Sequence, residues 1–114
     1  MEAMPAKRKT YAQITALLEA AADEHGPSAE RLEDTLTAGY AIALTLEAER
    51  LRIERRIAEV AGKLGNDESE LNAKELAGLS ERLSKADNEL VHLRTALVTL
   101  KHQARAARRA EAVA

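Results

Sequence analysis

The chain has 114 residues, of which 46% are hydrophobic and 32% are charged, and its formal net charge is −2. No apolar run approaches the ~20 residues that span a bilayer, and the composition is not that of a disordered chain. A net charge so close to zero gives no global attraction to nucleic acid or anionic lipid, and the absence of cysteine excludes disulfides and thiol chemistry.

The N-terminal quarter predicts an arm followed by a short helix. Residues 1–9 are basic and lack an apolar segment, so we expect a flexible arm there rather than a secretory signal. Thr10 and Gln13 have the spacing of a capping box at a helix start. The Gly-Pro pair at 26–27 is typical of a helix end. The pattern therefore predicts a helix over residues 10–25.

A second, longer helix is predicted over residues 28–64. Ser28 is a favourable N-cap residue, and Gly65 would end the helix as a C-cap. As far as Leu46 the apolar residues cover more than one face, and beyond it they narrow to a single stripe. We therefore expect the first half to be buried on several sides, whereas the second half needs only one partner.

The third helix is predicted over residues 72–110. Asn72 and Glu75 have capping-box spacing, and Leu71 and Leu76 have that of a hydrophobic staple. Apolar residues then recur at alternating spacings of three and four, the heptad pattern of a helix that packs against another helix. They are Leu76, Leu79, Leu83, Ala86, Leu90, Leu93, Leu97, Leu100, Ala104 and Ala107.

The seams of the second and third helices can be paired with one another. In an antiparallel pair an a position on one helix faces a d position on the other, and residue numbers that sum to 136 satisfy this rule throughout. The charged Arg50 then faces the small Ala86, from where it can reach toward Asp87. The pairs are Val60/Leu76, Ile57/Leu79, Ile53/Leu83, Arg50/Ala86, Leu46/Leu90, Ala43/Leu93, Gly39/Leu97 and Leu36/Leu100.

The sequence therefore predicts an all-α fold. Its main feature is a long antiparallel helical hairpin, similar to a coiled coil, with the short N-terminal helix packed at its base. Residues 10–111 would form a single three-helix domain. Because the first helix has to cover the apolar half of the second, we expect a three-helix base that carries a two-helix arm over roughly residues 47–83.

No residue pattern indicates catalysis. Glu89 and His92 have the Glu-x-x-His spacing of di-iron helical bundles, but the pair occurs once and no seam carboxylate lies opposite, so a solvated helix face is favoured. Arg50 could hold an anion, but no second basic residue lies near it in the seam, and a role in setting the register is favoured. We predict no enzyme activity, no metal and no cofactor.

Two basic clusters support an alternative function, that of a nucleic-acid-binding accessory protein. One is in the N-terminal arm, and the other, at the end of the third helix, offers Arg105, Arg108 and Arg109 as possible phosphate contacts. Cations are also favoured at any helix C-terminus by the helix dipole. No aromatic residue interleaves the clusters, and they need not converge, so binding to nucleic acid is the second choice.

Apolar residues outside the seam predict an interaction surface. Ile42, Leu44, Val91 and Val98 lie off the seam, and the short helix has too narrow an apolar stripe to cover them all. Exposed apolar patches mark interaction sites. We therefore expect a homodimer or higher oligomer joined through its base, acting as a self-associating adaptor, chaperone-like protein or scaffold subunit. A cytoplasmic location is expected, and the excess of Arg over Lys suggests a bacterial source.

Overall fold

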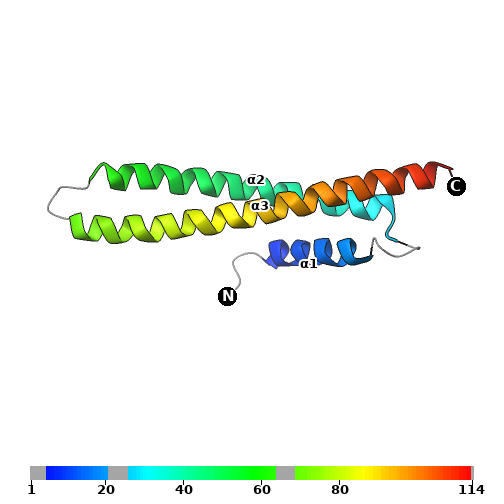
Figure 1. The fold of residues 1–114 in the computed structure, drawn as a ribbon, viewed down its shortest axis with the longest axis horizontal. Helices are drawn as coiled ribbons and strands as arrows, with labels where there is room; N and C mark the ends of the chain where they lie inside the picture. The colour runs from blue at the N-terminus through cyan, green and yellow to red at the C-terminus, as the bar shows by residue number, and fades with distance from the viewer. Residues whose placement is uncertain (1–4, 21–25, 64–68, 114) are drawn as a thin grey trace. The chain divides into compact units, whose positions relative to one another are not determined.

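The computed structural model describes residues 5–20, 26–63 and 69–113. These residues form three α-helices and no strand: α1 (Pro5–Ala20), α2 (Ala29–Ala61) and α3 (Ser69–Val113). Helices α2 and α3 pack against each other as a long antiparallel hairpin, and the shorter α1 accompanies them (Figure 1). The predicted all-α hairpin with a short N-terminal helix is confirmed.

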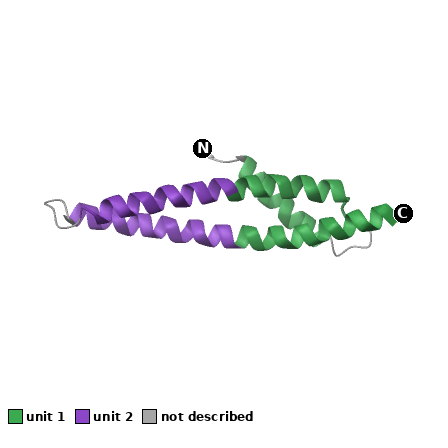
Figure 2. Ribbon diagram, turned by 90° about the horizontal axis from the view of Figure 1, so that it is seen from above, with its two compact units in different colours: residues 1–43, 92–114 green, residues 44–91 purple. Residues whose placement is uncertain are grey.

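Contacts within the chain divide it into two compact units (Figure 2). Unit 1 comprises residues 1–43 and 92–114, and unit 2 comprises residues 44–91. Unit 1 therefore holds α1, the first part of α2 and the last part of α3, whereas unit 2 holds only the remaining segments of α2 and α3. The single domain expected over residues 10–111 stays a prediction, and each unit is described by itself.

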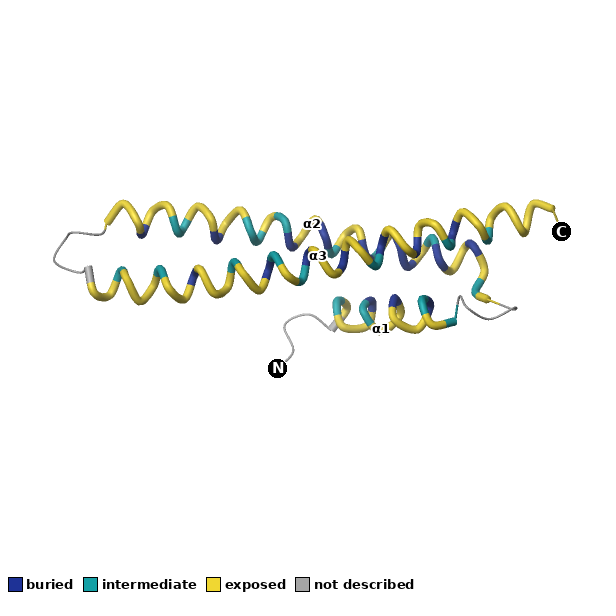
Figure 3. Tube along the Cα trace, viewed as in Figure 1, coloured by how far each residue is buried: buried dark blue, intermediate teal, exposed yellow. Residues whose placement is uncertain are grey.

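The core of unit 1 is formed by three helices. Helix α1 runs antiparallel to α2 (Figure 1) and buries Ile14 and Leu17, which are three residues apart on one face and only 4% and 2% exposed. Buried residues recur along each of the three helices (Figure 3). The other buried apolar residues of this unit are Ala29, Leu32, Leu36, Ala43, Leu93, Leu97, Leu100 and Ala104.

Gly39 marks the level at which all three helices of unit 1 meet. A Cβ atom on this residue would lie 2.5 Å from Cδ2 of Leu97 and 3.6 Å from Cδ1 of Ile14. The Leu97 side chain therefore occupies the space that a larger residue at position 39 would need. Leu32 and Ala104, whose numbers also sum to 136, are both buried. The predicted register is confirmed here, and the seam extends beyond Leu36.

The core of unit 2 is a two-helix seam. Ile53, Val60 and Leu79 form a buried cluster. Three partly buried residues of the predicted seam pack against this cluster: Ile57, Leu76 and Leu83. The guanidinium of Arg50 turns toward solvent, with Nε 3.1 Å from Oδ1 of Asp87, as predicted. A charged residue is thus accommodated in the seam without being buried.

The predicted start of the first helix was wrong. Helix α1 begins at Pro5, so residues 5–9 of the expected arm are helical. Proline suits the first helical turn, where its missing N–H costs nothing and its φ is already helical. Thr10 lies inside the helix, and its hydroxyl donates to the carbonyl of Ala6 at 3.0 Å instead of capping. The predicted end at residues 21–25 lies outside the described residues.

The predicted start of the third helix was also wrong, whereas the start of the second was right. Helix α3 begins at Ser69, so Asn72 is not its N-cap, and the amide of Asn72 donates to the carbonyl of Lys63 at 3.4 Å. Leu71 is 66% exposed and makes no staple. At the start of α2 the N–H of Arg31 donates to Oγ of Ser28 at 3.2 Å, which confirms the predicted N-cap.

The end of the second helix also differs from its predicted position. Helix α2 ends at Ala61, three residues before the predicted end at residue 64. A turn follows, in which the N–H of Lys63 donates to the carbonyl of Val60 at 3.0 Å. The proposed C-cap residue, Gly65, lies outside the described residues.

Candidate interaction surfaces

The heptad register gives the α2–α3 seam two flanks. In a heptad labelled a to g, the seam residues take a and d, positions b and e lie on one side, and positions c and g lie on the other. Leu36 of α2 and Leu76 of α3 are a positions in the confirmed register. We call the b and e side the first flank and the c and g side the second flank.

In unit 1, α1 covers the second flank and leaves the first flank open. Thr35, a g position on α2, is only 6% exposed, and the α3 residues Ala96 and Gln103, also at g, are half-buried. On the first flank Tyr40 and Val98 are 45% and 55% exposed. The single apolar stripe of α1 therefore covers one flank only, as the sequence suggested.

In unit 2 the first flank carries three large, exposed aliphatic residues. Leu44 and Leu51 of α2 are 67% and 53% exposed, and Val91 of α3 is 60% exposed. All three are b positions in the register. Each therefore leaves more than half of its side chain in solvent on the same flank of the two-helix seam.

The four residues of the predicted interface do not all share a flank. Leu44, Val91 and Val98 are exposed at b positions, whereas Ile42 is half-buried at a g position on the second flank. Tyr40 and Leu51 were not predicted, although the same heptad numbering would have found both. Their spacing from Leu44, four and seven residues, is the signal that was overlooked.

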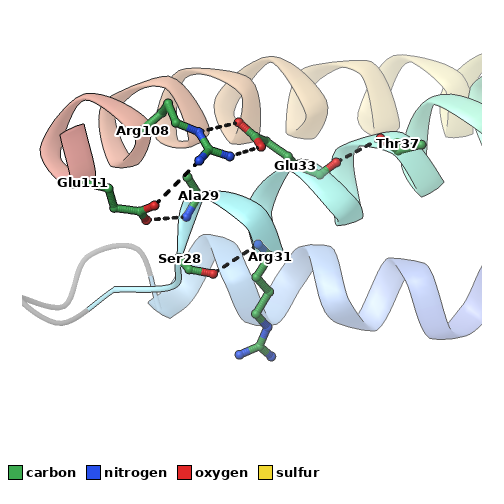
Figure 4. Close-up of polar contacts among 7 residues, drawn as sticks. All are labelled: Ser28, Ala29, Arg31, Glu33, Thr37, Arg108 and Glu111. Atoms are coloured by element: carbon green, nitrogen blue, oxygen red, sulfur yellow. Dashed lines mark hydrogen bonds and ion pairs between the residues drawn. The ribbon is translucent and has the colours of Figure 1, made fainter.

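The three predicted phosphate contacts have different surroundings. Arg108 forms an ion pair with Glu33 of α2, and Nε of Arg108 donates to Oε2 of Glu33 at 3.3 Å (Figure 4). The hydrogen bond to Glu33 raises the pKa of Arg108. Arg105 and Arg109 are exposed and pair with no acidic side chain among the described residues. Of the three predicted phosphate contacts, only Arg108 has an acidic partner within the described part of the chain.

The basic residues near the N-terminus are not beside those at the end of α3. Within unit 1, the first residues of α1 lie at the opposite end of that helix from the last turn of α3 (Figure 1). The ammonium of Lys7 lies 5.7 Å from the centre of the Tyr11 ring, within the range of a cation–π contact. The two clusters thus offer no joint surface for a phosphate backbone.

A carboxylate from the end of α3 caps the start of α2. The N–H of Ala29, a residue that is fully buried, donates to Oε2 of Glu111 at 2.8 Å (Figure 4). A negative charge at this position also suits the positive end of the α2 dipole. The hydrogen bond of Glu111 and the neighbouring ion pair of Arg108 with Glu33 therefore join the end of α3 to the start of α2.

A second inter-helix ion pair lies in unit 2, on the second flank. Nε and Nη2 of Arg56 donate to the two carboxylate oxygens of Glu75 at 2.8 and 3.0 Å. Both residues are g positions, which an antiparallel pair brings to the same flank of the seam. The guanidinium of Arg56, by its hydrogen bonds, lowers the pKa of Glu75 from its ordinary value of 4.5.

We expect this ion pair to give a measurable pH dependence. Because the folded-state pKa of Glu75 is lowered, its contribution to stability is present above about pH 4.5 and is lost as the pH falls through the folded pKa. In the Arg56→Gln variant the Glu75 carboxyl should titrate near its ordinary value, as followed by NMR of the side chain. An unchanged Glu75 titration in that variant would show that the pair does not persist in solution.

The described residues contain no group of three or more side chains that could hold a metal ion. Of the Glu-x-x-His pair, Glu89 is half-buried and His92 is exposed. None of the three helices, over the residues described, combines the length and the hydropathy of a membrane span. Comparison with known proteins found no matching family, no curated relative and no solved structure of similar fold.

Proposed function

We propose that the protein is a non-enzymatic helical interaction module that self-associates through the first flank. One observation carries the proposal: Leu44, Leu51 and Val91 are each more than half exposed at b positions of unit 2. Burying a side chain of this kind completely contributes ~1.5–3 kcal/mol. The flank thus holds apolar surface whose burial would stabilise a complex.

The charges on the first flank favour a second copy of the chain as the partner. In unit 1 the b and e positions carry two acidic residues on α2, Glu30 and Glu33, and a larger number of basic residues on α3. These four are Arg94, Lys101, Arg105 and Arg108. In unit 2 the e positions include three acidic residues: Glu47, Glu54 and Asp87. Unit 1 of one copy would therefore face unit 2 of another with opposite charge. Such an exchange is reciprocal, as a two-fold symmetric dimer requires.

The mass in solution tests the proposal. At tens of micromolar, light scattering coupled to gel filtration should give about 25 kDa, twice the chain mass of 12.4 kDa. Leu44→Glu combined with Val91→Glu should return the mass to that of one chain, because two carboxylates would have to be desolvated in the interface. The helical circular dichroism signal should stay, since both side chains are exposed in the single chain.

A matched control distinguishes the effect of a carboxylate on the first flank from the effect of a carboxylate elsewhere on the surface. Leu71 is 66% exposed on α3 but is a c position, on the second flank. Leu71→Glu should leave the dimer mass unchanged. If the unaltered chain has a mass near 12.4 kDa at this concentration, self-association is refuted. If Leu71→Glu dissociates the dimer as readily as the double variant does, the interface is not assigned to the first flank.

The nucleic-acid alternative has less support. The ion pair with Glu33 and the capping carboxylate of Glu111 occupy the surroundings of Arg108. Arg105 and Arg109 alone offer two phosphate contacts, and an affinity built on two such contacts would be weak at physiological salt.

A further inference from the structure

A shallow pocket on the second flank of unit 2 is unusually rich in arginine. It has a volume of about 290 Å³. Its floor is formed by two seam residues, Ile53 and Leu79, which are 3% and 5% exposed. The remaining lining residues are Glu49, Arg52, Arg56 and Arg82. Three of the five arginines in residues 44–91 therefore gather around one small depression.

Two of these three arginines have no acidic partner among the residues that the structure describes. Arg56 is occupied by Glu75, as described above, and its Nη1 also lies 3.2 Å from Oε2 of Glu59. Arg52 and Arg82 form no ion pair with any described residue, although Glu49 lines the same pocket. The pocket thus holds two guanidinium groups without an ion-pair partner among the described residues, one on each helix, and one carboxylate, that of Glu49 on α2.

The size and lining of the pocket restrict the ligand. A guanidinium presents a planar fork of N–H donors that matches the oxygens of a phosphate group. A volume of about 290 Å³ is at the small end of ligand pockets. No aromatic side chain lines it, so it offers nothing on which a nucleobase could stack. These features fit a compact polyanion better than a nucleotide or a nucleic acid.

We propose that Arg52 and Arg82 form a binding site for a small soluble ligand that carries phosphate groups. The two guanidinium groups approach the ligand from α2 and α3, so a ligand with two linked phosphates can engage both. Arg56 stays with Glu75, which neutralises its charge, so binding depends on Arg52 and Arg82. Glu49 opposes the ligand and limits its affinity.

Titration of the full-length protein with pyrophosphate, at constant ionic strength, tests the site. Calorimetry and the NMR signals of the arginine Nε–H groups should show saturable binding to one site per chain. Arg52→Gln and Arg82→Gln should each weaken binding about tenfold, the loss expected for a charge-assisted hydrogen bond. Glu49→Gln should strengthen it several-fold, since a nearby like charge is removed.

Arg55→Gln is the matched control. Arg55 is exposed on the same helix but does not line the pocket, so its loss should change the affinity less than about twofold at moderate salt. Binding that never saturates, or that falls equally in the Arg55 variant, would overturn the proposal. The three arginine variants change exposed side chains and Glu49→Gln changes a half-buried one to a residue of the same size, so circular dichroism should show unchanged helix content.

A single-stranded oligonucleotide serves as the competing probe. We expect it to bind more weakly than pyrophosphate on the basis of the pocket volume and the missing aromatic lining. Tighter binding of the oligonucleotide, reduced by Arg105→Gln with Arg109→Gln rather than by the pocket variants, would overturn the assignment and favour nucleic acid. Neither outcome depends on the dimer mass, so this site and the proposed self-association are tested separately.

Discussion

Leu90→Ala should lower the free energy of unfolding by ~2–5 kcal/mol, the range for a leucine truncated in a packed core. Leu90 is 1% exposed in the seam of unit 2, and its expected partner in the register, Leu46, is 4% exposed. A two-helix seam has no third helix that could move in to fill the space. The cost should therefore lie above the bottom of the range.

Urea unfolding followed by circular dichroism measures this effect, at one fixed protein concentration because association would raise the apparent stability. Leu71→Ala is the control: it makes the same chemical change on the same helix, but Leu71 is 66% exposed. Its effect should stay within about 0.5 kcal/mol. Equal effects of the two substitutions would mean that Leu90 does not face α2 in solution.

Replacing glycine by alanine should change the free energy of unfolding in opposite directions at Gly78 and at Gly39. In a helix interior this replacement stabilises by ~1 kcal/mol when nothing is in the way. Gly78 has no atom within 4 Å of an added Cβ, so Gly78→Ala should gain about that amount. At Gly39 the added Cβ would lie 2.5 Å from the buried Leu97 side chain, and overpacking costs ~1–3 kcal/mol.

We expect Gly39→Ala to be destabilising by as much as ~2 kcal/mol after the gain in helix propensity is subtracted. The two variants should then differ by ~1–3 kcal/mol in unfolding free energy, measured by the same urea titration. Gly39→Ala combined with Leu97→Ala should recover part of the loss, because the obstructing side chain is removed. A stabilising Gly39→Ala would show that Leu97 can move aside and that the packing at this level is loose.

The register of the α2–α3 seam was predictable because several independent features of the sequence select the same alignment. A heptad seam allows shifts of whole heptads, but only one register puts Gly39 against Leu97 and lets Arg50 face Ala86. The ion pair of Arg56 with Glu75 agrees with the same numbering, although it was not used to derive it. Apolar pattern, residue size and charge thus select one alignment.

The helix starts were less predictable, because a threonine or asparagine can serve two purposes. The Thr10 hydroxyl can cap a helix or donate to a carbonyl one turn earlier, and the sequence alone does not decide between these. Pro5 was the better signal, since proline is favoured in the first turn. The heptad numbering places Ile42 on the second flank, but whether that flank is covered depends on where α1 packs. A stripe of apolar residues in α1 does not specify which flank of the seam it covers.

The cap that Glu111 places on Ala29 spans 82 residues of sequence. We expect a contact of this separation to form late in folding, because the entropy of closing the long loop has to be offset by contacts made elsewhere. The N-cap at Ser28 needs only its own neighbours and can form at once. The first turn of α2 is therefore held by one early and one late interaction, and the exchange rate of the Ala29 amide proton reports on the docking of the chain's last helical turn.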